Sequence, residues 1–344
     1  LVVVFRRAGV VNPLHYRLES PTDKSLDIER NLVDHVTLGR SYSERMHGVL
    51  SVESHERACK VLRECGVVIL RGMYDPATVK DWGAAALEDF EKIAQALQKD
   101  HDMDVFNPGK KPPSRNFVEF ATREAFRCDI RHTPNLVALR KTQPKESERT
   151  SKEINPRHPI VVSILQDVAQ PDGGALKNHG NYGMWNFSFG GPGSRQRLAH
   201  GEIGAIVSTP GCFDQKIHAD IPHLFNTVDL PPHLLHAFMP ACDQGGFKAG
   251  QTAFVVGSHF LETCGRMTSE DGSGIEETIS NTIRPHVIPG DLVLFDCRVL
   301  HLGLPNTTAP LGSKEGVRRA ILYVNWHLPW FEDKKNWEMT SLFS

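Results

Sequence analysis

The second half of the chain consists of short apolar runs separated by Gly, Pro, Asn and Asp, and this pattern limits what the chain can fold into. Each run has the length of a strand and is short for a core helix, so the pattern predicts a β-sandwich or β-barrel. No glycine-rich phosphate loop follows a strand and opens a helix, so a nucleotide-binding fold is not expected. The expected strands cover residues 203–207, 234–238, 252–256, 292–295 and 320–324.

The first half of the chain is more helical and is expected to flank the β region. A strand is predicted at residues 65–72, and a helix starts at Asp75-Pro76, since Asp is a common N-cap and Pro a common first helical residue. Helical character is expected to return at residues 117–142. Residues 1–55 are weakly patterned and are interpreted as an N-terminal arm, and residues 56–344 as one domain.

Composition excludes several classes of partner. The formal net charge of -2 and the pI of about 6.8 provide no basic surface for nucleic acid. No apolar run approaches the roughly 20 residues that cross a membrane. Seven cysteines without a Cys-x-x-Cys pair indicate free thiols in a reducing compartment. We therefore expect a cytoplasmic monomer or homodimer that acts on a small molecule and binds neither nucleic acid nor membrane.

Residues 172–200 combine seven glycines with four large aromatic side chains, among them Trp185. Flexible backbone carrying aromatics is typical of a lid over a small-molecule pocket, and Trp185 is then a candidate substrate contact. A plain connecting loop whose aromatics cap the core fits the composition equally well. Both interpretations stay open.

His218 and Asp220 are candidate metal ligands within the β region. On a strand, residues i and i+2 point the same way, so the imidazole and the carboxylate would converge on one face. With a second histidine they would form the facial triad of non-haem Fe(II) oxygenases, which leaves positions open for a cosubstrate and dioxygen. His200 and Glu202 form a rival pair, ranked lower because it lies at the edge of the glycine-rich segment, where ligand geometry is harder to fix.

Two later segments supply the missing partners. A Pro289-Gly290-Asp291 turn enters a predicted strand, and His301 follows five residues after that strand as the candidate third ligand. The strand at residues 317–326 then opens on Arg318-Arg319. Because the planar guanidinium binds carboxylates through two hydrogen bonds, an arginine here suits the distal carboxylate of 2-oxoglutarate.

This ordered set resembles the phytanoyl-CoA dioxygenase-like Fe(II)/2-oxoglutarate oxygenases over residues 60–330. The resemblance implies a mainly β fold with flanking α-helices, the double-stranded β-helix (jelly roll, cupin-like). It also implies that Fe(II), 2-oxoglutarate and dioxygen are the cofactors. The family's iron ligands match His218, Asp220 and His301, and its 2-oxoglutarate arginine matches Arg318.

Further matches surround the cosubstrate. The resemblance places Gln215, Thr252 and Phe238 near 2-oxoglutarate. The segment Ala249–His259 is similar to the family's NGxTxxxPGSH pattern, with Ala249 and Val256 in place of the usual Asn and Pro. The Gly-Ser-Gly run that often follows the second histidine is Leu302-Gly303-Leu304 here, which removes one hydroxyl contact.

The interval between His301 and the arginines is longer than usual, with residues 309–316 as the expected insertion. Strand alternation allows only one of Arg318 and Arg319 to face the pocket. Arg318 is predicted to face it, on the same side as the small and apolar Ala320 and Leu322.

Other histidines are assigned by their distance from the candidate ligands. His223 and Phe225 follow the first ligand pair closely and are predicted to line the substrate cavity. The remaining histidines of the β region are expected to be non-ligands: His233, His236, His259 and His286.

The predicted function is oxidation of a C–H bond of a small metabolite, with hydroxylation as the default outcome and succinate and CO2 as co-products. A role in secondary metabolism is expected. Desaturation and cyclisation need no change in the triad, whereas halogenation is disfavoured because Asp220 is present. The alternatives are a cupin-type metal isomerase, a dioxygenase that does not use 2-oxoglutarate, and a non-catalytic binding protein of the same fold.

Overall fold

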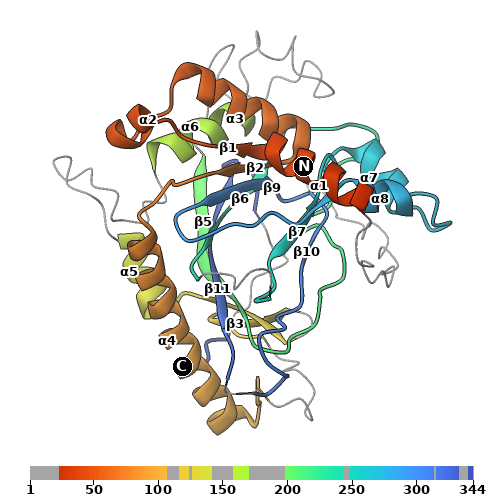
Figure 1. Ribbon diagram of the computed structural model, residues 1–344. Helices are drawn as coiled ribbons and strands as arrows, with labels where there is room; N and C mark the ends of the chain where they lie inside the picture. Colours follow the sequence, from red (N-terminus) through yellow and green to blue (C-terminus); the bar gives the residue numbers. More distant parts are fainter. Residues whose placement is uncertain are drawn as a thin grey trace.

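The computed structural model describes residues 23–106, 116–123, 126–141, 158–169, 198–242, 248–313, 315–332 and 340–343. Its strands form a large and a small sheet (Figure 1). The strands are β1 (Thr37–Leu38), β2 (Val67–Leu70), β3 (Phe120–Arg123), β4 (Arg127–Arg131), β5 (Ala199–Ser208), β6 (Leu234–Pro240), β7 (Thr252–Val255), β8 (Thr282–Ile283), β9 (Leu292–Asp296), β10 (His301–Gly303) and β11 (Arg319–His327). The eight-stranded sheet has the order β1-β2-β9-β6-β11-β5-β4-β3, and the three-stranded sheet the order β10-β7-β8.

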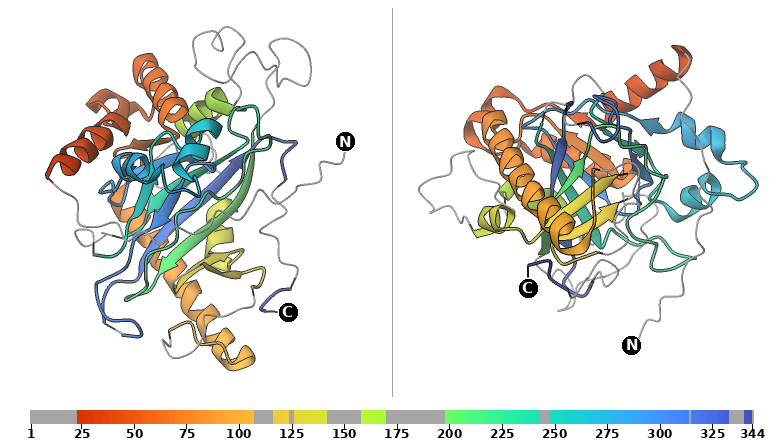
Figure 2. Two further views of the ribbon diagram at one scale, coloured as in Figure 1. Left: turned by 90° about the vertical axis from the view of Figure 1, so that its right-hand side faces the viewer. Right: turned by 90° about the horizontal axis from the view of Figure 1, so that it is seen from below.

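Helices cover the large sheet on its outer side, as Figures 1 and 2 show. Among them, α3 contacts β2, β9 and α6, and α4 contacts β5 and β11. The buried apolar core lies between these helices and the sheet. The helices are α1 (Asp23–Val36), α2 (Tyr42–His47), α3 (Val52–Cys65), α4 (Pro76–His101), α5 (Pro134–Lys141), α6 (Pro159–Ala169), α7 (Leu261–Met267) and α8 (Ile275–Ser280).

Local chemistry sets several element boundaries. Asp75 caps α4 by accepting a 2.9 Å hydrogen bond from the backbone N–H of Thr78, and Pro76 is the first helical residue, as predicted. Between α3 and β2, Gly66 has a φ of 74°, and a Cβ there would lie 2.3 Å from a methyl of Val299. Only glycine fits this turn without displacing its neighbours.

The five strands predicted in the second half are all present as β5, β6, β7, β9 and β11, although β7 ends one residue before the predicted end at residue 256. β11 lies at the centre of the large sheet, antiparallel to both β5 and β6, with Tyr323 opposite Phe238 on β6. The mainly β architecture with flanking helices is therefore confirmed. The large sheet turns its inner face towards β7 and β10 of the small sheet, and the cavity described below lies between them.

The helical prediction for residues 117–142 is wrong over most of its length. β3 and β4 form an antiparallel hairpin that extends the large sheet beyond β5, and among the residues of this range that the structure describes only those of α5 are helical. β4 alternates charged side chains with the buried Cys128 and Ile130. Alternation with a period of two is typical of a strand with two distinct faces. It is the sequence feature from which a strand, rather than a helix, could have been predicted here.

The segment interpreted as an N-terminal arm is joined closely to the domain where the structure describes it. β1 pairs in parallel with β2, and Glu29 of α1 lies 2.7 Å from the guanidinium of Arg284. The boundary predicted at residue 55 falls inside α3. Most of the predicted lid, including Trp185, lies outside the described residues, so both interpretations of that segment stay predictions.

All seven cysteines lie in described segments and form no disulfide, which agrees with the expected free thiols. No helix among the described residues is long and apolar enough to span a membrane.

Candidate active site

His218 and His301 lie side by side where the loop between β5 and β6 meets β10. The backbone N–H of His218 donates to the carbonyl of His301 at 3.0 Å, and the reciprocal bond measures 2.8 Å. Their ring centroids are 4.5 Å apart. Asp220 completes the group: its carboxylate oxygens lie 3.9 Å from Nε2 of His218 and 3.6 Å from Nε2 of His301. The structure thus brings together the three residues that the sequence selected as metal ligands.

Backbone carbonyls fix which ring nitrogen each histidine presents. Nδ1 of His218 is 2.8 Å from the carbonyl of Lys216, and Nδ1 of His301 is 2.9 Å from the carbonyl of Val299. A carbonyl only accepts, so in the neutral tautomer each Nδ1 carries the hydrogen and each Nε2 offers its lone pair. Both lone pairs then belong to the nitrogens that lie nearest Asp220.

The protonation states also fit a metal. Burial lowers the pKa of His301 to about 4, against the attraction of Asp220, so this imidazole is neutral at neutral pH. Burial alone would raise the pKa of Asp220, but the imidazoles of His301 and His236 hold that pKa below its usual range. Neutral imidazole and ionised carboxylate are the forms that bind a divalent ion, so the three side chains fit Fe(II).

The metal group opens onto a cavity of about 710 Å³ between the two sheets. Gln215, Thr252 and Phe238, which were predicted near the cosubstrate, all line this cavity. The side-chain carbonyl of Gln215 accepts a 3.0 Å hydrogen bond from the backbone of Gly303. Arg319 also lines the cavity, and its side chain is only 1 % exposed.

Comparison with known sequences decides the family. The chain matches the sequence model of the phytanoyl-CoA dioxygenase family over residues 62–311, which is most of its length. The chain belongs to the phytanoyl-CoA dioxygenase family. It is therefore a 2-oxoglutarate-dependent non-haem iron dioxygenase with a double-stranded β-helix, and its cofactors are Fe(II), 2-oxoglutarate and dioxygen. The cupin-type isomerase, the dioxygenase without 2-oxoglutarate and the non-catalytic binding protein are set aside by this membership.

Solved structures similar to this family member share little sequence with it. AviO1 from Streptomyces viridochromogenes Tue57 is 16% identical, with 81% of this chain and 97% of that chain covered and a TM-score of 0.41. The non-heme alpha ketoglutarate dependent carbocyclase SnoK from nogalamycin biosynthesis is 18% identical, with 81% and 84% covered and a TM-score of 0.43. HygX from Streptomyces hygroscopicus, solved with nickel and 2-oxoglutarate bound, is 13% identical, with 82% and 89% covered and a TM-score of 0.43.

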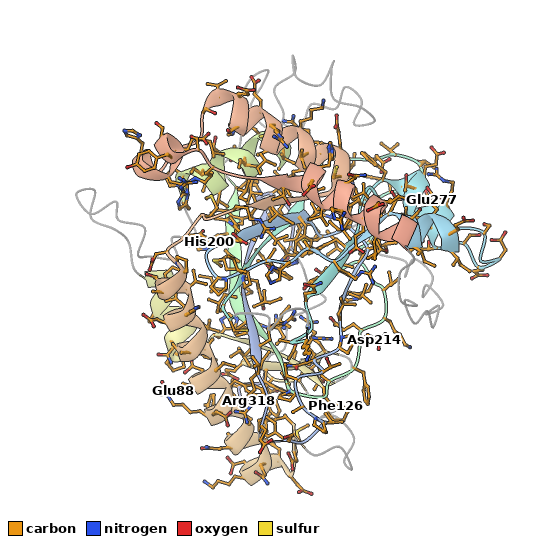
Figure 3. All side chains as sticks on the ribbon, in the orientation of Figure 1. Glu88, Phe126, His200, Asp214, Glu277 and Arg318 are labelled. Carbon is orange, nitrogen blue, oxygen red and sulfur yellow. The ribbon has the colours of Figure 1, made fainter. Side chains whose placement is uncertain are left out.

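The prediction that Arg318 faces the pocket of this dioxygenase is wrong. Arg318 (labelled in Figure 3) has a side chain that is 32 % exposed. It forms an ion pair with Glu91 of α4, and its guanidinium lies 4.9 Å from the ring centre of Phe106. Arg319 is the arginine that faces the cavity. Both faces of β11 are buried, one against the helices and one towards the cavity. Apolar residues occur on both faces of β11, so the apolar Ala320 and Leu322 did not show which face of the strand lines the cavity.

Arg127 of β4 is a second buried arginine in the cavity, which the sequence interpretation missed because it read this segment as helical. Its Nε donates to Ser208 Oγ at 2.9 Å, and its Nη2 donates to the carbonyl of Leu304 at 2.6 Å. The guanidinium occupies the space beside Gly303, where a Cβ would lie 2.6 Å from Cζ of Arg127. This explains why the chain has no larger residue at the position of the family's usual serine.

Arg127 and Arg319, which we call the arginine pair, share Ser208. Arg319 donates to Ser208 Oγ at 3.1 Å and also to the carbonyl of Gly250. Within the described residues both guanidinium groups donate only to neutral acceptors, and Nε of Arg319 is buried without a partner. Burial, followed by repulsion from Arg127, lowers the pKa of Arg319. Two buried cations without a carboxylate between them favour an anion at this end of the cavity.

His236 of β6 is a further residue of the metal centre and was expected to be a non-ligand. Its Nε2 lies 3.1 Å from Oδ2 of Asp220, and the side chain is largely buried. Asp220, His236 and Cys297 also form a group whose potential ligand atoms lie within 4.8 Å of one another. A histidine at this distance can donate to the carboxylate and fix its orientation.

The rival pair His200 and Glu202 is not brought together as ligands. Glu202 pairs with Nε2 of His132 at 2.9 Å, and the ring of His200 packs at 6.0 Å from that of Trp326. Neither residue belongs to a metal-ligating group within the described part of the chain. The lower ranking of this pair agrees with the geometry.

His223 and Phe225 do not line the cavity, so that prediction is wrong. His223 lies 3.7 Å from Asp229, and Phe225 is exposed. The chain leaves the cavity wall after Asp220, and closeness in sequence therefore did not carry these two side chains to the site.

Proposed function

We propose that this dioxygenase hydroxylates a C–H bond of a small metabolite, with His218, Asp220 and His301 as the iron ligands. The observation that carries the proposal is the coexistence in one cavity of a metal-ligand group and of the arginine pair, Arg127 and Arg319. A short dicarboxylate cosubstrate such as 2-oxoglutarate can chelate a metal with one end and place its distal carboxylate against the two arginines with the other.

Arg319 is the residue we assign to the distal carboxylate of 2-oxoglutarate. Its buried Nε lacks a partner among the described residues and can donate to one carboxylate oxygen while a terminal nitrogen donates to the other. Arg127 adds a second positive charge from β4, which flanks β5 on the side away from β11. The amide of Gln215 and the hydroxyl of Thr252 line the same cavity and are assigned to the remaining oxygens of the cosubstrate.

When bound, iron and 2-oxoglutarate supply the oxidation, in which one oxygen atom of dioxygen enters the substrate C–H bond and the other enters succinate as CO2 leaves. The protein orients the reactants and keeps water out. Phe238 provides an apolar wall, and its ring packs edge-to-face on Phe295 at 4.8 Å. His236 holds the carboxylate of Asp220 in position for the metal.

The rest of the cavity supports a polar substrate. Its lining includes Arg131, His132, Glu202, Asn325 and His327. The side-chain oxygen of Asn325 is buried and has no partner within the described residues. A wall of this kind favours a metabolite with several hydrogen-bonding groups over a purely apolar one. A role in secondary metabolism stays a prediction.

The test measures succinate formed from 2-oxoglutarate by the full chain with Fe(II), ascorbate and a panel of polar metabolites. The proposal expects succinate in wild type, equimolar with oxidised metabolite when the right one is present, and none from His301→Ala. Metabolite turnover without succinate would support a metal enzyme of another type. Metabolite binding without any turnover would support a binding protein. Either result would overturn the proposal.

A further inference from the structure

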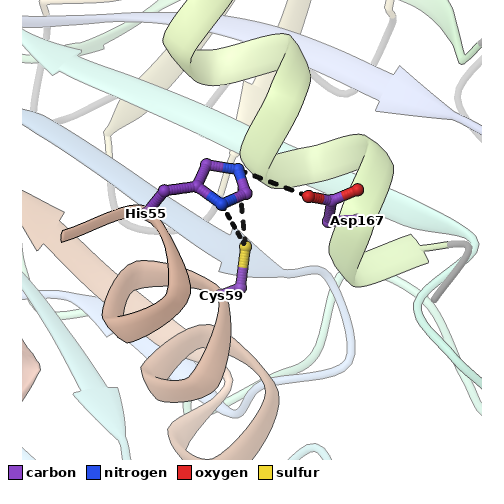
Figure 4. Close-up of side chains that lie close together, drawn as sticks. All are labelled: His55, Cys59 and Asp167. Carbon is purple, nitrogen blue, oxygen red and sulfur yellow. Dashed lines mark hydrogen bonds and ion pairs between the residues drawn. The ribbon is translucent and has the colours of Figure 1, made fainter. Parts of the chain in front are cut away.

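Asn325 of β11 lines the dioxygenase cavity, and the described residues leave its side-chain oxygen unsatisfied. This oxygen is buried and accepts no hydrogen bond from them. Polar side chains between α3 and α6, outside the cavity, show the opposite case, because Nε2 of His55 lies 3.4 Å from Oδ2 of Asp167 (Figure 4). A buried amide oxygen without a donor costs about 1–3 kcal/mol. Its position in a cavity therefore points to a ligand that supplies the donor.

Asn325 lies beside the metal group. It is directly opposite His236 of β6, and both side chains line the cavity. Opposite residues of antiparallel strands have Cβ atoms about 4.5–5.5 Å apart. Nε2 of His236 in turn lies 3.1 Å from Oδ2 of Asp220. A ligand group bound to the amide of Asn325 would therefore be held close to the iron ligands.

The cosubstrate is too short to reach this amide. Arg319, assigned to the distal carboxylate of 2-oxoglutarate, shares the inner face of β11 with Asn325 and begins the strand. At about 3.3 Å per residue, the two positions are roughly 20 Å apart along the strand. A five-carbon dicarboxylate that binds both Arg319 and the metal is much shorter than this. Asn325 therefore faces the part of the cavity that is left for the substrate.

A β-bulge opposite Asn325 keeps its amide accessible. The register of β11 against β5 shifts between Val324 and Trp326. Two residues of β5, Gly201 and Glu202, therefore oppose the single Asn325, and both line the cavity. Bulges occur next to active sites, where they redirect side chains. A Cβ at Gly201 would lie 3.4 Å from the Cβ of Asn325, so a longer side chain there would pack against the amide.

Neighbouring polar groups of the same wall are already engaged with one another. The hydroxyl of Tyr323 donates to Asp129 at 2.8 Å. The same carboxylate lies 2.5 Å from a guanidinium nitrogen of Arg123 and 3.5 Å from one of Arg131. This network does not extend to Asn325, whose oxygen is left for the substrate.

The chemistry of the amide selects a hydroxyl group. An amide offers an acceptor oxygen and a donor NH2 group, and a hydroxyl both donates and accepts. An ammonium group only donates, and it would share the cavity wall with the guanidinium groups of Arg123 and Arg131. A carboxylate only accepts, so it would leave the buried oxygen of Asn325 unpaired.

We propose that Asn325 binds a hydroxyl group of the substrate close to the carbon that is oxidised, and that the substrate is a neutral polyhydroxylated metabolite. Glu202 and His327 line the same part of the cavity and provide hydrogen-bonding groups for further hydroxyls. The inference rests on the proposed oxygenase function and names its substrate class. Asn325 selects and positions the substrate, and no proton or electron passes through it.

The test measures succinate formed by the full chain with Fe(II), 2-oxoglutarate, ascorbate and a panel of neutral polyols, cyclitols and glycosides. Mannitol, myo-inositol and methyl glucoside are members, each paired with monodeoxy, amino and carboxylate analogues. We expect a neutral member to raise succinate formation, and one of its monodeoxy analogues to have a KM at least about tenfold higher. If no succinate forms under any condition, the proposed function fails and the inference with it. If succinate forms but no neutral member raises its rate, the inference alone is overturned.

Asn325→Leu removes the acceptor and the donor at similar side-chain size. In this variant the KM values of the polyol and its monodeoxy analogue should differ by less than about threefold, while the KM for 2-oxoglutarate stays within about twofold of wild type. Asn325→Asp keeps an acceptor at the same length and should retain the discrimination. Asn31→Leu, at an exposed position of α1, is the control and should behave as wild type.

Two results with these variants would overturn the inference. One is wild-type discrimination between the polyol and its monodeoxy analogue in Asn325→Leu. The other is a rise in the KM for 2-oxoglutarate that equals the rise for the polyol, because this would show that Asn325 only supports the fold of the cavity.

Discussion

The two ends of the dioxygenase cavity differ in how their residues come together. At the metal end, His218 and Asp220 are two residues apart, and His301 meets them through a single backbone bridge. At the anion end, Arg127 and Arg319 come from strands far apart in sequence, and each pairs with β5 at Ser208. Local spacing defines the first end, and sheet pairing defines the second.

This difference has energetic consequences. At the metal end, the carboxylate of Asp220 and the imidazole of His301 have the protonation states that bind a divalent ion before the ion arrives. The anion end holds two buried cations that repel each other until an anion arrives. We therefore expect substitutions at the metal end to abolish function and substitutions at the anion end to weaken cosubstrate binding by a measurable factor.

The largest effect is expected for His218→Ala and His301→Ala. Each leaves two protein ligands, which hold a divalent ion poorly, so iron content and turnover should both be lost. Iron per chain after anaerobic loading, together with succinate formation, is the measurement. His47→Ala on the exposed face of α2 is the control and should behave as wild type. Full iron content in either triad variant would show that the metal end is wrongly assigned.

The next largest effect separates the two neighbouring arginines. Arg319→Ala removes a buried charged partner of a carboxylate, which costs on the order of 2–5 kcal/mol, so the KM for 2-oxoglutarate should rise tens- to thousands-fold. Arg318→Ala removes a partly exposed ion pair with Glu91 and should cost about 0–1 kcal/mol. Steady-state kinetics on both variants measure the two KM values for 2-oxoglutarate. A larger rise in KM for Arg318→Ala than for Arg319→Ala would contradict the orientation of β11 described above.

The same contrast explains what the sequence could predict. The metal ligands follow from strand alternation and chain order, and the five strands of the second half follow from their apolar runs. Arg319 could not be separated from Arg318, because β11 is buried on both faces and apolarity marks neither. Arg127 was hidden in a segment whose alternation was overlooked. His236 needed the pairing of β6 with its neighbours to bring it to Asp220.

A smaller effect is expected at His236, which belongs to the metal end but does not complete the triad. His236→Leu removes the donor to Asp220, and losses of this kind typically reduce metal affinity about 10- to 100-fold. His236→Gln can still donate from its amide and should recover part of the loss. Metal titration of the apo-protein measures both. Equal affinities for wild type and His236→Leu would show that the carboxylate needs no such support.

The smallest effect is expected for Glu202→Gln. Glu202 pairs with His132 in the polar part of the cavity and is not part of a metal group in the described residues. Iron affinity should change by less than about 1 kcal/mol, as for a partly exposed pair. Loss of iron from this variant, with iron retained in Asp220→Gly, would instead favour the His200 and Glu202 pair as the metal end.

The most direct test of the account is equilibrium binding of 2-oxoglutarate to the anaerobic protein with and without Fe(II), because it asks whether both ends hold one ligand. Wild type should bind tightly only with iron. His301→Ala should lose the dependence on iron, and Arg319→Ala should keep it while binding at least tenfold more weakly. Binding that is equally tight in Arg319→Ala and wild type would contradict the claim that the metal group and the arginine pair form a single site.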